Sequence, residues 1–541
     1  MKRCSQRFTR WWIGFGQDGR ANQALGGVLA LVCLTVALVG VPRLRIYGHD
    51  IFIALDGAWR VVNGQRPAID FFAQMGPAYY LLHAAGLRLA GNAAIGLGYS
   101  STIAVAVLSV WSFVLLRRRM RPAPFFLACV FLALLTAAPF PLGHSPWQTS
   151  FSMKHNRYGF ALTALVLLES FLPDDGLEGK RPFWGGFSTG LAAALLLFLK
   201  TSFGLVGLTL AAVSLAFRRS SLNRLAGMAA GLGVFSLPML VYLSFDVPAL
   251  TAEFRTLVSA RDQGTGGYAL AKVLYFDRFE IAPYLLLALL VCLLPGVRMR
   301  RALTLALVVV MAVLAGGMLM VTNTSQHYAV PLLGAAALVL MNEATEASRS
   351  KEDWIAAIPP LALGLMLVGM PASLDAGGLL FAVKDKFAGS EPGYQLEAPH
   401  LAGLEFVSCR EKVFGYPCSP NDNGAAFVRY TQEGMDLIRA NSDPGESVRG
   451  MGMSNPFSYG MLRRSARGGT VILQGGHNVR WDAMPPLMQL IGDAALLLIP
   501  KFEASERNTL AAILGRYPDL LGGTFIQVAE SENWILYRRR K

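Results

Sequence analysis

A chain of 541 residues that is 53% hydrophobic and only 16% charged, with a mean hydropathy of +0.42, lies outside the range of soluble globular proteins. This composition predicts a polytopic α-helical membrane protein. The formal net charge of +14 would suit a nucleic-acid-binding protein. However, the arginines fall in short clusters at the ends of apolar runs, where they orient a membrane protein, so we expect no nucleic-acid partner.

The N-terminal segment MKRCSQRFTRWW is basic and aromatic, and an apolar run from about 25 to 41 follows it without a small-residue cleavage site. This pattern predicts a cytoplasmic tail over 1–24 and a retained first membrane span, not a removed signal peptide.

The first loop, 43–94, holds three carboxylates among aromatic and aliphatic residues just after that span. They belong to Asp50, Asp56 and Asp70. Carboxylates are costly at a membrane edge, which indicates an interfacial reactive site. Residues 50–63 have the pattern of an amphipathic helix lying on the bilayer surface, in which Asp56 and Arg60 are one turn apart and can pair.

A structural explanation of the same acids must be weighed beside the functional one. Asp50 can cap the N-terminus of the interfacial helix by accepting backbone N–H bonds, and Asp56 can be a solvated residue paired with Arg60. Capping by Asp50 does not account for the two further acids or for the GPAYYLL run that leads into the next helix.

The order of these features is an acid after the first span, a helix, the glycine Gly64 about one helix length later, and a Pro-aromatic run. It resembles the first extracytoplasmic loop of the GT-C superfamily of polyprenyl-phosphate-sugar-dependent glycosyltransferases. The members it most resembles are bacterial protein-mannosyltransferase-like enzymes and lipid A aminoarabinose or galacturonosyl transferases, whose loop reads D-[DE]-x-x-Y, then Gly, then a Pro-Leu-Tyr-Tyr-like run. This chain has Asp50-Ile51 where the family usually has two acids.

Ten further apolar runs predict about eleven transmembrane helices, within a GT-C-like domain over 25–372. They lie near 95–116, 123–141, 158–172, 185–199, 203–217, 225–244, 283–296, 302–321, 328–341 and 355–372. With the N-terminus inside, the basic clusters RRRMR, RRSSLNR and VRMRR all fall on the cytoplasmic side, as the positive-inside rule requires. The first loop, the 142–157 loop, the 245–282 loop, the 322–328 turn and everything after about 372 then face outward.

The last part of the chain, 373–541, has no apolar run of span length and is richer in Gly, Pro, Asn and charge. We expect an extracytoplasmic soluble α/β domain that acts as a lid or as an acceptor-docking or structural unit. Its predicted helices lie at about 425–440 and 505–517, its apolar stretches at 471–473 and 494–499, and its closing hairpin at about 527–537. Cys409 and Cys418 are expected to form a disulfide in this oxidising compartment.

The outward loops carry a set of basic residues. Taken singly, each is expected to snorkel to lipid headgroups, but as a set with Arg60 they predict a basic cavity suited to a lipid phosphate. The set is Lys154, His155, Arg157, Lys200, Arg255, Arg261 and His327, with Lys272 and Arg278 nearby. Many GT-C members place a second acid in the loop before the fourth span. This loop has none, and the acids of the long loop that can substitute are Asp246, Glu253, Asp262, Asp277 and Glu280.

The resemblance implies an enzyme of the bacterial inner membrane that moves a sugar from a polyprenyl-phosphate donor to a glycan, lipid or protein acceptor on the outer face. Asp50 is expected to act as the general base, and Asp56 to orient the loop or the acceptor through Arg60. No cofactor is certain, and a divalent metal is possible. Two alternatives stay open: a transporter or flippase of lipid-linked sugars, and a non-catalytic assembly factor for envelope polysaccharide, for which Asp50-Ile51 is the best argument.

Overall fold

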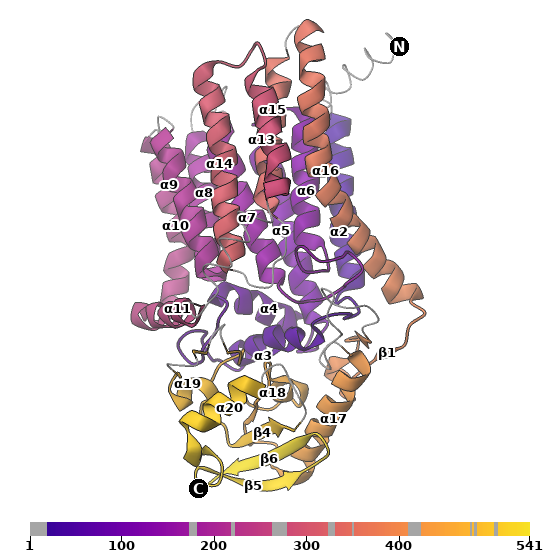
Figure 1. Cartoon of the computed structure of the whole chain (residues 1–541), viewed down its shortest axis with the longest axis vertical. Helices are drawn as coiled ribbons and strands as arrows, with labels where there is room; N and C mark the ends of the chain where they lie inside the picture. Colours follow the sequence, from indigo (N-terminus) through magenta and orange to yellow (C-terminus); the bar gives the residue numbers. More distant parts are fainter. Residues whose placement is uncertain are drawn as a thin grey trace.

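The structure is a computed structural model that describes residues 19–172, 181–217, 222–261, 278–322, 330–348, 351–408, 423–475, 479–480, 484–501 and 507–540. A long helical bundle stands above a smaller mixed α/β region that contains the C-terminus, and short helices lie across the base of the bundle between the two (Figure 1).

Within the described residues, the bundle has eleven helices, and each falls on one of the eleven predicted runs. They are α2 (Gly19–Val39), α5 (Gly96–Leu116), α6 (Pro122–Ala137), α7 (Lys154–Phe171), α8 (Arg181–Leu199), α9 (Thr201–Phe217), α10 (Leu222–Tyr242), α13 (Arg278–Cys292), α14 (Met299–Thr322), α15 (Pro331–Ala347) and α16 (Lys351–Ala388). Six of them, α2, α5, α8, α10, α14 and α16, are long and apolar enough to cross a membrane, and α6, α9 and α13 are shorter apolar helices. The predicted polytopic helical architecture is confirmed.

Two helices form the centre of the bundle and have almost no exposed side chains. Every residue of α7 is buried, and so is the stretch from Leu332 to Thr345 of α15. Because their neighbours shield them from lipid, these helices tolerate polar side chains. Glu169 of α7, for example, accepts hydrogen bonds from Arg119 at 2.9 Å and from Arg224 at 2.5 and 2.7 Å.

Helices α8 and α10 approach each other so closely that glycine is required at their contact. A Cβ atom on Gly186 would lie 2.1 Å from the carbonyl oxygen of Arg224, and one on Gly190 would lie 2.1 Å from that of Met228. The facing residues on α10 include Gly227 and Gly231, which makes this the small-residue packing known from membrane helices.

Helix α16 does not end near 372 as predicted but continues to Ala388. Its extension carries Asp385, which accepts hydrogen bonds from Arg43 at 3.0 Å and from Arg45 at 2.7 Å. Both arginines come just after the first span. The helix therefore reaches beyond the bundle toward the α/β region (Figure 1), and that region begins after Ala388.

Three helices and a short 3-10 turn lie at the base of the bundle: η1 (Gly48–Asp50), α3 (Ile51–Val62), α4 (Pro77–Leu89) and α11 (Val247–Arg261). The helix predicted over 50–63 is present as α3, but all residues from Ile51 to Arg60 are buried. The helix was predicted to be amphipathic and to lie on the bilayer surface, but over this stretch it has no exposed polar face. The α/β region covers it from the other side, through α18 (Pro456–Gly460) among other elements.

The α/β region contains a four-stranded sheet in the order β3-β4-β6-β5. Strands β3 (Val448–Gly450) and β4 (Leu496–Pro500) are parallel, while β6 (Trp534–Arg539) is antiparallel to both β4 and β5 (Phe525–Glu530). The other elements are β1 (Gly393–Tyr394), η2 (Pro399–Leu401), β2 (Phe406–Val407), α17 (Gly424–Asn441), α19 (Leu487–Ile491), α20 (Arg507–Arg516) and η4 (Pro518–Leu520).

The predicted helices at 425–440 and 505–517, the apolar stretch at 494–499 and the closing hairpin therefore all exist as regular elements. The stretch at 471–473 is not a strand of this sheet. It lies beside the first loop, where the backbone N–H of Val471 donates to the carbonyl of Phe72. One hydrophobic cluster runs from the bundle through α3 into this region, so the two parts share a core.

Candidate active site

Asp50 ends η1 and occupies the N-cap position of α3, but its side chain makes no hydrogen bond to the N–H groups of that helix. The explanation of Asp50 as a helix cap is therefore wrong. The carboxylate instead accepts a hydrogen bond from the Ser152 hydroxyl on Oδ2, and its Oδ1 lies 3.2 Å from Nε2 of His49. The Asp50 side chain keeps 12% of its surface exposed.

Backbone pairing between distant segments brings Ser152 to Asp50. The N–H of Arg45 donates to the carbonyl of Thr149 at 2.9 Å, and the Thr149 hydroxyl donates to the carbonyl of Arg43 at 2.6 Å. These contacts fix the loop before α7 against the chain that leaves the first span. The predicted outward loops therefore do meet, with His155 and Lys154 one short turn beyond Ser152.

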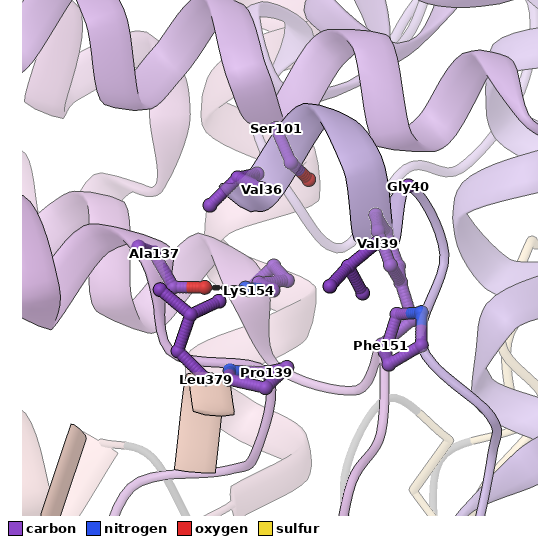
Figure 2. A pocket seen from close by; sticks show the side chains of 10 residues that line it. Val36, Val39, Gly40, Ser101, Ala137, Pro139, Phe151, Lys154 and Leu379 are labelled. Carbon is purple, nitrogen blue, oxygen red and sulfur yellow. Dashed lines mark hydrogen bonds between the residues drawn. The ribbon is translucent and has the colours of Figure 1, made fainter. Parts of the chain in front are cut away.

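Lys154 is buried at the start of α7, and its ammonium group donates to the last carbonyls of α6, those of Ala137 at 3.1 Å and Ala138 at 2.8 Å. The same side chain lines a small cavity between the ends of α2, α5, α6 and α16 (Figure 2). Ser101 and Phe151 line the cavity with it. Lys154 thus anchors the C-terminal end of α6 and lines this cavity.

Arg157 lies one turn further along α7, and its Nε and Nη1 atoms donate hydrogen bonds to protein groups. It donates to the carbonyls of Phe140 at 2.7 Å and Leu135 at 3.0 Å, and it pairs with Asp375 of α16 at 2.9 Å. Its position ties α7 to α16 and to the C-terminal end of α6.

A cluster of rings that the sequence reasoning did not single out lies beside Asp50. The ring of Tyr79 is 4.4 Å from that of His83 and 5.5 Å from that of His155, and Nδ1 of His83 lies 2.6 Å from the Ser100 hydroxyl. Burial, with a smaller effect of Lys154, lowers the pKa of His83 to about 3, so this imidazole is neutral at pH 7. Burial also raises the pKa of Tyr79 well above its usual value, with a smaller contribution from Asp50. The i, i+4 spacing of Tyr79 and His83 puts both rings on one face of a helix, and this spacing was the feature of the sequence that indicated the cluster.

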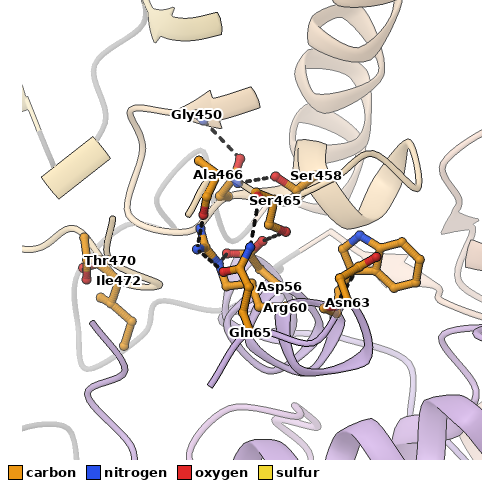
Figure 3. Close-up of polar contacts among 12 residues, drawn as sticks. Asp56, Arg60, Asn63, Gln65, Gly450, Ser458, Ser465, Ala466, Thr470 and Ile472 are labelled. Atoms are coloured by element: carbon orange, nitrogen blue, oxygen red, sulfur yellow. Dashed lines mark hydrogen bonds and ion pairs between the residues drawn. The ribbon is translucent and has the colours of Figure 1, made fainter. Parts of the chain in front are cut away.

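Asp56 and Arg60 lie within α3, and their environment differs from that of Asp50 at the N-cap of this helix. Both side chains are 0% exposed and their ion pair is 3.1 Å long, so the pairing was predicted but the solvated setting was wrong. Arg60 also donates to the carbonyls of Ala466 at 2.7 Å and Gly468 at 3.0 Å, and Ser465 lies 3.4 Å from Asp56 (Figure 3). This pair joins α3 to the α/β region.

Of the five acids named as possible second carboxylates, Glu253 is the one that the structure brings against the first loop. Its carboxylate accepts the backbone N–H of Ala73 at 2.5 Å, and burial raises its pKa to about 8. Asp246 instead caps α11 through the N–H of Ala249, and Glu280 lies in the first turn of α13. Asp262 and Asp277 lie outside the described residues.

Asp70, the third acid of the loop, accepts hydrogen bonds from the backbone N–H of Arg66 at 2.8 Å and from its guanidinium at 3.2 Å.

Lys200 lies at the junction of α8 and α9, next to Leu199, whose carbonyl accepts the N–H of Gly76 at 2.8 Å. Arg255 is exposed on α11. Arg261 and Arg278 are terminal residues of described helices whose side chains the structure does not describe, and Lys272, His327, Cys409 and Cys418 lie outside the described residues.

Among the described residues, no group of three or more His, Cys, Asp or Glu side chains is arranged to hold a metal ion. The chemistry available around Asp50 is that of one accessible carboxylate, a hydroxyl, neutral and aromatic rings, and the Lys154 cation.

Comparison with known proteins found no matching family model and no matching curated protein. Among solved structures, the chain is similar to ArnT from Cupriavidus metallidurans bound to undecaprenyl phosphate, with 15% identity and a TM-score of 0.49 over 94% of this chain and 97% of that one. The apo state of the same protein gives 15% identity and a TM-score of 0.45, over 96% and 98% of the two chains. The function proposed below rests on this chain's own residues.

Proposed function

We propose that this protein is a membrane glycosyltransferase that moves a sugar from a polyprenyl-phosphate donor to an acceptor hydroxyl at the outer face of the membrane. The observation that supports it most directly is the setting of Asp50. This carboxylate does not cap α3. It accepts a hydrogen bond from Ser152, lies 3.2 Å from His49, and is partly exposed where the first two outward loops meet.

Sugar transfer at the outer face of the membrane requires the groups found around Asp50. Nucleotide sugars are absent there, so a donor must be carried by lipid, and a polyprenyl phosphate is the leaving group. An acceptor hydroxyl needs a base for its proton, and the departing phosphate needs positive charge. In this proposal Asp50 takes the proton, and its hydrogen bond from Ser152 fixes the direction of the carboxylate.

The basic residues of the outward loops divide between two roles in this proposal. Lys154 lines the small cavity near Asp50 and is the cation proposed to face the donor phosphate, with His155 beside it. Arg157 and Arg60 are assigned to positioning, because their guanidinium groups are hydrogen-bonded to carbonyls and carboxylates of the protein. Asp56 then orients α3, and therefore Asp50, through Arg60.

Mass spectrometry of lipid A, core oligosaccharide and surface glycans from a deletion strain tests this function. We expect one class of glycan or lipid to lose a single sugar, with its polyprenyl-phosphate precursor accumulating outside. Complementation with the wild-type gene should restore the sugar, and complementation with Asp50→Asn should not. Loss of a whole lipid-linked chain, with the precursor trapped on the cytoplasmic side, would instead identify a flippase.

A further inference from the structure

Arg449 is the central residue of β3 and is buried completely, yet none of its three guanidinium nitrogens has a hydrogen-bond partner among the residues that the structure describes. The backbone around it is fully organised. The N–H of Gly450 donates to Asn455 at 3.0 Å, and the carbonyl of Val448 accepts from Ser458 at 2.9 Å. The unpaired groups at this position are therefore those of the Arg449 side chain and not of the neighbouring backbone.

The groups that act on Arg449 are the Asp56–Arg60 pair of α3. Burial lowers the pKa of Arg449 to about 10, while the charge of Asp56 opposes that shift and the charge of Arg60 adds to it. Asp56 is already engaged with Nε of Arg60, and Nη2 of Arg60 also lacks a hydrogen-bond partner among the described residues. Arg449, Arg60 and Asp56 are all 0% exposed. Within the described part of the chain, two buried guanidinium groups therefore share the charge of one carboxylate, which leaves one positive charge in excess.

An uncompensated charge of this kind is strongly unfavourable inside a protein, and folded proteins neutralise it with a counter-charge that also accepts the free hydrogen bonds. The excess here is a single charge, and the donors are N–H groups of two planar guanidiniums. A compact monovalent anion matches both properties, because it cancels the charge and accepts hydrogen bonds from several directions.

We propose that a small monovalent inorganic anion, with chloride as the simplest case, binds between Arg449 of β3 and Arg60 of α3 and joins the α/β region to the base of the bundle. The site is separate from the carboxylate of Asp50, and the proposal does not depend on the reaction that the protein catalyses. It gives the α3 interface a bound ion as one of its components.

Thermal unfolding of the full-length protein in detergent, in mixtures of chloride and gluconate at constant ionic strength, tests the proposal. We expect the midpoint to rise with chloride to a plateau about 2–4 °C higher. Arg449→Met, which removes the excess charge, should unfold at the same temperature in both salts. The matched control Arg439→Gln, at an exposed arginine paired with Asp436, should keep the wild-type response.

A wild-type midpoint that is equal in chloride and gluconate would overturn the proposal, and so would a chloride response retained by Arg449→Met. A second measurement needs no variant. Crystals of the wild-type protein grown in bromide should show an anomalous peak within hydrogen-bond distance of the Arg449 guanidinium, and a map without that peak would mean that no anion is bound there.

Discussion

Two carboxylates close together in the chain, one at the N-cap of α3 and one within that helix, occupy very different environments. Asp50 and Asp56 are six positions apart, but Asp50 retains exposed surface and contacts a hydroxyl and an imidazole, whereas Asp56 is enclosed and paired with Arg60. A base must reach its substrate, so only Asp50 meets that condition. The sequence pattern alone places both acids after the first span and does not distinguish them.

Glu253 gives a prediction for the pH dependence of stability. Its pKa in the folded protein is about 8, above its ordinary value of 4.5, so between these values the folded state holds a proton that the unfolded chain has released. Its contribution to stability is complete below about pH 4.5 and falls as pH rises toward 8. Glu253→Gln keeps an acceptor for Ala73 and should flatten that fall.

Unfolding midpoints measured from pH 4.5 to 8.5 check this, with Asp436→Asn, at an exposed carboxylate, as the control that should keep the wild-type slope. Equal slopes for wild type and Glu253→Gln would show that Glu253 titrates normally.

At the scale of elements, hydropathy located the eleven bundle helices, because burial in lipid or in a helical bundle leaves a long apolar run in the sequence. Hydropathy did not predict the burial of α3 or the continuation of α16 to Ala388. The burial of α3 depends on contacts with Ser465, Ala466 and Gly468, about 400 positions away in the chain, and such docking has no local signal. The extension of α16 is held by Arg43 and Arg45, which lie 342 and 340 positions from Asp385 in the chain.

The candidate site shows the same division. Asp50, Lys154 and His155 were singled out because they lie beside predicted spans. The contacts of Ser152, His83 and Glu253 instead depend on which distant segments pack together, and the sequence does not indicate this. Arg449 was also missed, since an arginine in a short strand is ordinarily exposed.

The contact between α8 and α10 gives a prediction at this scale. An added methyl group at Gly190 would lie 2.1 Å from the Met228 carbonyl, so Gly190→Ala must force the helices apart. We expect a loss of about 1–3 kcal/mol in the free energy of unfolding. Gly233→Ala, on the exposed side of α10 where an added Cβ meets no atom within 4 Å, is the matched control and should have little effect. Equal unfolding free energies in detergent for the two variants would contradict this packing.

For the whole molecule, the contacts of the first loop with residues 463–472 place that loop and the α/β region on the same side of the membrane. Helix α2 precedes that loop and is long and apolar enough to cross a membrane, which puts its N-terminal end on the other side. The charge rule predicts that the N-terminus is cytoplasmic and that the C-terminus is outside. Reporter fusions at Lys541 should therefore be active only outside the cell, and a cytoplasmic C-terminus would reverse the placement of Asp50.

In the proposed mechanism Asp50 performs the chemistry and Asp56 holds the neighbouring helix α3 in place. The most direct test is the transfer rate of purified variants, measured with the lipid-linked donor and the acceptor that the deletion strain reveals. Asp50→Asn keeps the shape of the side chain and removes the basic oxygen, so the rate should fall about 100- to 10,000-fold with an unchanged unfolding midpoint. Asp56→Asn should lower the rate less and the stability more, because it leaves Arg60 without its buried partner. Full activity of Asp50→Asn together with an inactive, stable Asp56→Asn would contradict the account, and activity in both variants would exclude this loop from catalysis.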